Sequence, residues 1–211
     1  MRFYFTKTPI IIKGLFTRYI WCFLTSKREI YLTFDDGPIP EVTEFVLSQL
    51  KKFNVTATFF CIGENIQKYP SIFRKIITYG HGVGNHTYHH LNGWKTSTDD
   101  YIKNVIKTEL LMKKNEKNTR LFRPPYGKIK RSQASILLKR NYKIIMWDII
   151  SADFDTKTSK EQCVENVLRK VKKGSIIVFH DSEKAKEKLY HALPIVLESL
   201  TNKGYKFKSI D

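Results

Sequence analysis

From residue 28 onward, short apolar runs alternate with longer segments in which apolar residues recur every three or four positions. The first pattern is typical of β-strands and the second of amphipathic helices. Strands are therefore predicted at residues 29–34, 57–62, 82–85, 121–122, 143–148, 175–179 and 205–210. Helices are predicted at residues 42–53, 72–79, 99–112, 132–139, 161–171 and 192–201.

The order of these elements predicts an α/β fold. Residues 175–179 form a continuous apolar run, which indicates a strand of a parallel sheet covered by helices. About seven strands are predicted, and an α/β barrel that closes regularly has about eight. We therefore expect an irregular, distorted (β/α) barrel with about seven parallel strands.

Residues 1–27 precede this alternation and form an apolar and basic segment. Lys13 and Arg18 interrupt its apolar part, residues 9–24, which is too short and too charged to predict a transmembrane helix. The segment also lacks the features of a clear signal peptide, which favours a cytoplasmic or membrane-peripheral location over secretion. We expect either a peripheral helix packed on the outside of the domain or an interfacial membrane anchor. On a helix, its apolar side would carry Ile12, Leu15, Phe16, Tyr19 and Phe23.

The chain of 211 residues is long enough for one well-buried core, assigned to residues 28–211. Its 37 Lys and Arg residues against 20 Asp and Glu give a net charge of +17. Such a charge attracts polyanions such as nucleic acid, anionic lipid or acidic cell-wall polymer, but it is spread along the whole chain. No nucleic-acid-binding signature is present, so no specific nucleic-acid partner is expected. Three cysteines at scattered positions do not form a disulfide framework.

Two adjacent carboxylates, Asp35 and Asp36, end the first predicted strand. Gly37 and Pro38 follow them and predict a sharp turn that exposes both side chains. Adjacent carboxylates point in different directions, so one could bind a metal ion while the other abstracts a proton.

Three of the six histidines lie within five residues. His86 and His90 are four positions apart, so on a helical turn they would share a face and could bind one metal ion. Two histidines and one carboxylate leave open coordination positions, as a catalytic metal site requires. His89 is interpreted as a neighbour and not as a ligand.

Two further segments carry groups suited to acid–base chemistry. Near Asp35, Arg123 would lower the pKa of that carboxyl group and orient it. The backbone N–H of Tyr126 is the first free donor after two prolines and could face a developing oxyanion. His180 ends a buried strand and can be a general acid if a carboxylate keeps it protonated. Asp148 is the candidate for that carboxylate.

In this order, the motifs resemble those of the polysaccharide deacetylase family, carbohydrate esterase family 4, which shares the NodB homology domain. The resemblance covers residues 28–211. Its motifs are TFDDGP at 33–38, H-x-x-x-H at 86–90, R-x-P-Y at 123–126, D-x-x-S-x-D-aromatic at 148–154, and a strand ending in His180. The resemblance implies a distorted (β/α) barrel of about seven strands and a metal-dependent hydrolase.

The resemblance also implies a role for each site residue. One divalent metal ion, Zn²⁺ first and Co²⁺, Ni²⁺ or Mn²⁺ as alternatives, would be bound by Asp36, His86 and His90. Catalysis would use Asp35 as base, His180 as acid, Arg123 to orient the base and Asp148 to tune the acid. Oxyanion and substrate contacts would come from Tyr126, Pro125, Phe154, Val178 and Trp147. Phe154 and Val178 stand where the family commonly has Trp and Leu, which affects the expected substrate fit.

The function expected from this resemblance is removal of N-acetyl groups from amino sugars of a polysaccharide or oligosaccharide, such as peptidoglycan or chitin-like N-acetylglucosamine. In this hypothesis Asp35 deprotonates the attacking water and His180 protonates the leaving amine. Three alternatives stay open. They are a deacetylase or deformylase of a lipid-linked amino sugar at the membrane, an O-acetyl xylan esterase, and a polyanion-binding protein without catalysis. Peripheral contact with an anionic membrane or cell wall suits the charge, and the oligomeric state is open.

Overall fold

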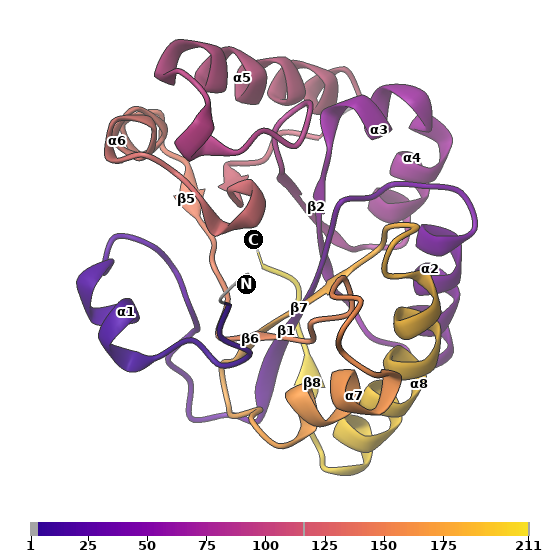
Figure 1. The fold of residues 1–211 in the computed structure, drawn as a ribbon. Coiled ribbons are helices and arrows are strands. Elements are labelled where there is room, and N and C mark those ends of the chain that lie inside the picture. Colours follow the sequence, from indigo (N-terminus) through magenta and orange to yellow (C-terminus); the bar gives the residue numbers. More distant parts are fainter. Residues whose placement is uncertain (1–3, 116, 211) are drawn as a thin grey trace.

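A curled parallel sheet forms the centre of the protein, whose computed structural model describes residues 4–115 and 117–210 (Figure 1). The strand order is β5-β4-β3-β2-β1-β7-β6, and β8 pairs with β1. Every pairing between these strands is parallel, as the apolar runs predicted. The strands are β1 (Glu29–Asp35), β2 (Thr58–Cys61), β3 (Gly82–Asn85), β4 (Leu121–Phe122), β5 (Lys143–Ile144), β6 (Ile149–Ile150), β7 (Ile176–His180) and β8 (Lys206–Phe207).

Helices flank the sheet and bury its outer face, which confirms the predicted irregular (β/α) barrel (Figure 1). The rings of Phe34, Phe59 and Phe179, from β1, β2 and β7, pack together at the centre of the largest core cluster. The helices are α1 (Ile10–Leu15), α2 (Val42–Lys52), α3 (Gly63–Lys68), α4 (Pro70–Thr78), α5 (Thr98–Lys114), α6 (Arg131–Lys139), α7 (Lys160–Leu168) and α8 (Lys186–Asn202), with 3₁₀ turns η1 (Gly93–Lys95) and η2 (Pro125–Gly127).

Helix starts follow local side-chain chemistry. The Ser97 hydroxyl accepts a hydrogen bond from the Asp100 N–H at the start of α5, and Ser159 and Gln162 form a capping box at the start of α7. The strand predicted at 143–148 is interrupted in the structure, because β5 covers only Lys143–Ile144 and the next strand, β6, begins at Ile149, beyond the predicted range. β5 pairs with β4, and β6 pairs with β7.

The N-terminal segment fills the space beside this interrupted strand. Ile20 pairs with the β5 side, since its N–H donates to the Ile144 carbonyl at 2.9 Å. Thr8 and Thr6 pair with the β6 side through the Asp148 carbonyl and the Ile150 N–H. Between these contacts, α1 lies on the outside of the barrel (Figure 1). In the described part of the chain, no helix has the length and apolar character needed to cross a bilayer.

Candidate metal centre and active site

The candidate catalytic side chains gather at the carboxyl ends of neighbouring strands. Asp35 is the last residue of β1 and is the register partner of His180, the last residue of β7. His86 directly follows β3. The carboxyl ends of parallel strands meet at one edge of a barrel, so residues distant in the sequence converge there.

Asp36, His86 and His90 form a compact cluster. Each offers one ligand atom, and these atoms lie within 4.8 Å of one another. The Asp36 Oδ1 atom is 3.7 Å from His86 Nε2 and 3.2 Å from His90 Nε2. Within the described residues, this Oδ1 atom is buried and has no hydrogen-bond partner. A buried carboxylate oxygen that faces two imidazole nitrogens fits a divalent metal ion of borderline softness, such as Zn²⁺.

The surroundings of both imidazoles suit metal binding. His86 Nδ1 lies 2.7 Å from the Arg123 carbonyl oxygen and donates to it, which leaves Nε2 to face the cluster. His90 Nδ1 lies 3.1 Å from the Tyr126 hydroxyl. Burial lowers the pKa of both imidazoles, although the Asp36 carboxylate counteracts this for His90. Both histidines are therefore neutral at neutral pH, as ligands must be.

The two histidines do not share a helical turn, contrary to the expectation from their spacing. Residues 86–90 form an irregular loop after β3, in which Thr87 and His90 have φ values of 63° and 53°. Asp36 also has a left-handed φ, 86°. Non-glycine residues in this region carry backbone strain, which persists when the surrounding structure fixes it. The cluster is therefore assembled by two constrained loops.

A buried acidic side chain holds the Asp36 loop in place. Asp181 accepts hydrogen bonds from the Gly37 N–H at 3.0 Å and from the Thr43 hydroxyl at 2.6 Å. Burial raises the pKa of Asp181 to about 8. A Cβ on Gly37 would lie 2.0 Å from Asp181 Oδ2. The Asp181 side chain can therefore lie this close to the turn only because residue 37 is glycine.

Asp35 is paired with Arg123, as the sequence predicted. Arg123 is fully buried, and its Nη1 atom donates to Asp35 Oδ1 at 2.6 Å. Nη1 also donates to the Thr33 hydroxyl, and Nε and Nη2 donate to the Ile145 and Met146 carbonyls, which fixes the orientation of the guanidinium group. Burial raises the pKa of the Asp35 carboxyl group, and the Arg123 charge opposes that rise without cancelling it. Arg123 therefore lowers the pKa of Asp35 as expected, but desolvation, which the sequence did not predict, raises that pKa by more.

His180 is paired with Asp153, and not with Asp148 as expected. Its Nδ1 atom lies 2.8 Å from Asp153 Oδ1, and its backbone N–H donates to Asp153 Oδ2 at 2.8 Å. Burial alone would lower the pKa of the imidazole, but the nearby carboxylates, Asp153 first, raise it to about 9. A histidine that is protonated at neutral pH can serve as a general acid.

Asp148 has a different role because it lies before β6, beside the start of β7. Its backbone N–H donates to the Ile176 carbonyl, and its carboxylate accepts a hydrogen bond from Ser175 at 2.6 Å. Lys7 and Lys13 of the N-terminal segment form ion pairs with the same carboxylate. Asp148 therefore anchors the N-terminal segment at the side of the barrel.

The residues expected to contact substrate occupy varied environments. Phe154 packs edge-on against His180 with 4.9 Å between ring centroids, and the Tyr126 side chain is 55% exposed beside His90. Trp147 packs against the loop after Tyr126, Pro125 is buried, and Val178 is fully buried two residues before His180 on the same face of β7.

Sequence reasoning missed the roles of Asp153 and Asp181. Both lie in segments already singled out, at the aromatic-ended motif and directly after His180. The signal for Asp153 was its position after a strand, next to an aromatic residue. No sequence signal identified Asp181 as the support of the Gly37 turn.

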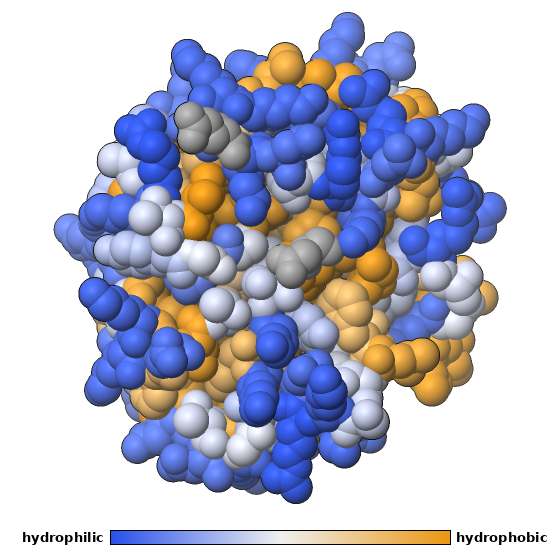
Figure 2. Space-filling view, turned by 180° about the vertical axis from the view of Figure 1, so that it is seen from behind, coloured by the Kyte–Doolittle hydropathy of each residue, from blue (hydrophilic) through white to orange (hydrophobic). Residues whose placement is uncertain are grey.

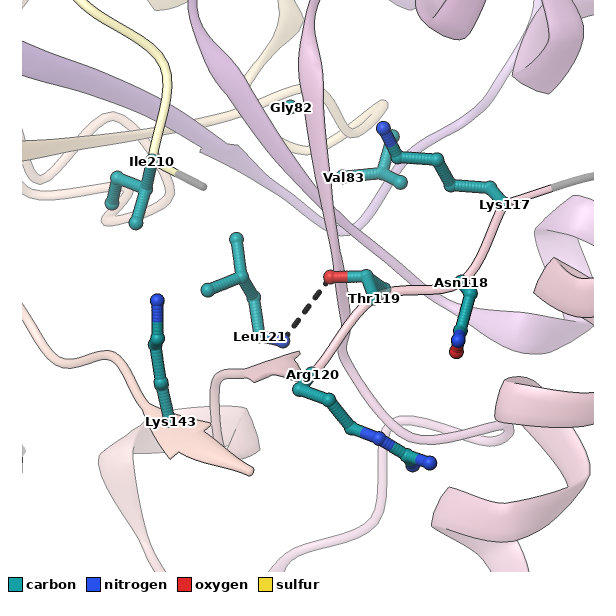
Figure 3. Close-up of a pocket in the computed structure, with 9 residues that line it drawn as sticks. All are labelled: Gly82, Val83, Lys117, Asn118, Thr119, Arg120, Leu121, Lys143 and Ile210. Carbon is teal, nitrogen blue, oxygen red and sulfur yellow. Dashed lines mark hydrogen bonds between the residues drawn. The ribbon is translucent and has the colours of Figure 1, made fainter. Parts of the chain in front are cut away.

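A pocket of about 230 Å³ lies at the opposite end of the sheet (Figure 3). It is lined by residues at the amino ends of β3, β4 and β5, including Gly82, Leu121 and Lys143. None of the candidate catalytic residues contributes to it. This pocket is therefore separate from the active-site edge of the barrel.

Comparisons with known proteins agree with this geometry. The family model described as polysaccharide deacetylase matches residues 24–145. A peptidoglycan-N-acetylglucosamine deacetylase of Bacillus cereus is 37% identical over 187 residues, which cover 88% of this chain and 68% of that protein. A peptidoglycan-N-acetylmuramic acid deacetylase of Bacillus subtilis is 30% identical, with 89% of this chain and 72% of that protein covered.

The fold is also similar to solved structures. The crystal structure of a peptidoglycan N-acetylglucosamine deacetylase, Bc1960, superposes with a TM-score of 0.89 and 34% sequence identity, covering 96% of this chain and 95% of that chain. The structure of a peptidoglycan deacetylase from Bacillus subtilis gives a TM-score of 0.80 at 30% identity, covering 88% and 89%.

Proposed function

Because the chain belongs to the polysaccharide deacetylase family, we propose that it removes N-acetyl groups from the amino sugars of peptidoglycan. The family relationship makes it a hydrolase of the amide C–N bond of N-acetyl sugars. The choice of peptidoglycan is supported by the names of its relatives, which include deacetylases of both peptidoglycan amino sugars.

One observation supports this proposal most strongly. The Asp36, His86 and His90 cluster lies at the same edge of the barrel as a carboxylate paired with a buried arginine and a histidine paired with a buried carboxylate. Amide hydrolysis requires activation of water, polarisation of the carbonyl and protonation of the leaving amine. With a bound metal ion, this arrangement would provide a group for each requirement.

We propose Zn²⁺ as the ion held by Asp36, His86 and His90. When bound, such an ion would supply a Lewis acid that makes water acidic and polarises the amide carbonyl.

The residues of the chain would move the protons. Asp35 accepts the proton of the attacking water, whose oxygen forms a bond to the carbonyl carbon. Arg123 favours the ionised form of the accepting carboxylate and orients it. The C–N bond then breaks, and His180 donates its Nε2 proton to the departing amine while Asp153 holds Nδ1. The products are acetate and a free amino sugar. The Tyr126 N–H is the proposed oxyanion donor, and such a donor contributes roughly 3 kcal/mol of barrier lowering.

The test is acetate release from peptidoglycan and from N-acetylglucosamine oligomers. The protein is treated with EDTA and assayed before and after addition of Zn²⁺ or Co²⁺. Release that depends on the added metal and is greater from peptidoglycan supports the proposal. Release from the oligomers alone would assign a chitin-like substrate, and no release from metal-loaded protein would contradict deacetylation of either.

A further inference from the structure

Large apolar side chains are exposed mainly in the N-terminal segment. Eleven such side chains are exposed in the described part of the chain, and six of them lie between residues 5 and 24. The six are Phe5, Ile10, Ile11, Leu15, Phe16 and Leu24. The other five are scattered over the remainder of the protein, as is normal for a globular surface.

Helix α1 presents three of its four apolar residues outward and its charged residue inward. Ile10, Ile11 and Leu15 are 83%, 72% and 73% exposed, whereas Lys13 is directed at the buried Asp148 carboxylate. No residue of α1 is buried. This orientation is the reverse of that of a helix packed on a hydrophobic core, and it leaves the apolar side free for another partner.

We call Ile10, Ile11, Leu15 and Phe16 the N-terminal apolar surface. In Figure 2 an orange area marks the lower right of the molecule, where α1 lies in that view. Ion pairs with Asp148 and the hydrogen bonds of Ile20 hold the segment on the barrel at both ends. The surface is therefore a fixed part of the fold.

The charged residues of the N-terminal segment are all positive. Residues 1–28 contain six Lys and Arg residues and no Asp or Glu. Arg18, Lys27 and Arg28 of this segment are exposed, and the whole chain has a net charge of +17. An apolar surface on a cationic segment is complementary to a bilayer with anionic headgroups, where apolar side chains enter the acyl boundary and cations bind phosphates.

We propose that the N-terminal apolar surface docks the protein peripherally on a bilayer that contains anionic phospholipid. A cell-wall polyanion would satisfy the cations but would leave Ile10, Ile11 and Leu15 in water. A second copy of the chain would cover the apolar residues but would bring two strongly cationic molecules together. This docking is independent of the substrate, since vesicle binding requires no catalysis.

The test is co-sedimentation of the full chain with vesicles of phosphatidylglycerol and phosphatidylcholine, and with vesicles of phosphatidylcholine alone. The protein is expected to bind the anionic vesicles. The variant Ile11→Gln/Leu15→Gln is expected to bind at least about tenfold more weakly, because two apolar side chains no longer leave water. Leu110→Gln is the matched control, since Leu110 is 60% exposed on α5, and it is expected to bind like the unmodified protein.

Thermal unfolding and deacetylase assays on soluble oligomers accompany each variant, so that misfolding and loss of activity are recognised separately from loss of binding. Absence of vesicle binding would overturn the proposal. So would binding that Ile11→Gln/Leu15→Gln leaves unchanged, which would indicate attraction by charge alone. Dimerisation of the unmodified protein that this variant abolishes, measured by sedimentation velocity, would assign the surface to a second copy instead.

Discussion

His89 and His90 are neighbours in the sequence but their imidazoles face different groups. His90 Nε2 lies 3.2 Å from Asp36, whereas His89 Nδ1 lies 3.1 Å from the Asn104 side chain. We expect His90→Gln to lose bound metal and at least about 100-fold in the rate of acetate release, because one of three ligands is removed. His89→Gln is the matched control and should retain both. Metal content after dialysis and acetate release measure the difference, and equal losses in the two variants would contradict the ligand assignment.

The pairing of His180 with Asp153 predicts a specific change in pH dependence. The acid must be protonated, so the rate should fall as the pH rises through about 9, the pKa of His180. Asp153→Asn removes the largest contribution that raises this pKa, and burial then lowers it. The alkaline limb of the pH–rate profile should therefore move to lower pH, with a lower kcat at neutral pH.

Asp148→Asn separates the two carboxylates experimentally. Burial alone would raise the pKa of Asp148, but hydrogen bonds from Lys13, Lys7 and Ser175 lower it by more. The ionised carboxylate therefore stabilises the fold at neutral pH, and this stabilisation is lost as the pH falls through the lowered pKa. Asp148→Asn should lower the free energy of unfolding by about 2 kcal/mol, a modest loss because both lysines of the ion pairs are partly exposed. It should leave the alkaline limb of the pH–rate profile unchanged. A shift of that limb by Asp148→Asn, and not by Asp153→Asn, would restore the original expectation for Asp148.

At the scale of elements, the turn after β1 determines where Asp36 points. Gly37→Ala would place a Cβ 2.0 Å from Asp181 Oδ2, and Asp181 is held by Thr43 from α2. We expect a loss of about 2 kcal/mol in the free energy of unfolding, because a buried contact must move. We also expect weaker metal binding, because Asp36 moves with the turn. Denaturant unfolding and metal titration test this, and unchanged metal affinity would show that the turn does not position Asp36.

The same elements show how far the sequence determines the site. Asp35, Asp36, His86 and His180 could be predicted, because each follows a recognisable strand and parallel strands end at one edge. The choice between Asp148 and Asp153 could not be made from sequence, since it depends on where the segment 143–150 breaks into β5 and β6. Side-chain pattern does not determine this break, which arises from pairing with β4 at one end and β7 at the other. The orientation of α1 could not be predicted either, because the inward direction of Lys13 depends on its ion pair with Asp148, which is distant in the sequence.

At the scale of the whole molecule, the proposed metal site would join two separate parts of the barrel. Asp36 follows β1, and His86 and His90 follow β3, with β2 between these strands in the sheet. An ion that binds only the folded state stabilises it by about 4 kcal/mol when its concentration is about a thousandfold above Kd. For a chain of this size each kcal/mol raises Tm by roughly 2–4 °C.

We therefore expect Zn²⁺ to raise the Tm of EDTA-treated protein by roughly 10 °C in differential scanning calorimetry. His90→Gln should abolish most of this rise, whereas His89→Gln should keep it, since surface histidines bind metal too weakly to contribute. An equal rise in both variants would place the stabilising ion elsewhere on the protein. No rise in the unmodified protein, with Zn²⁺ bound by direct analysis, would mean that the ion also binds the unfolded chain. In that case the cluster would not act as a bridge between the two strand ends.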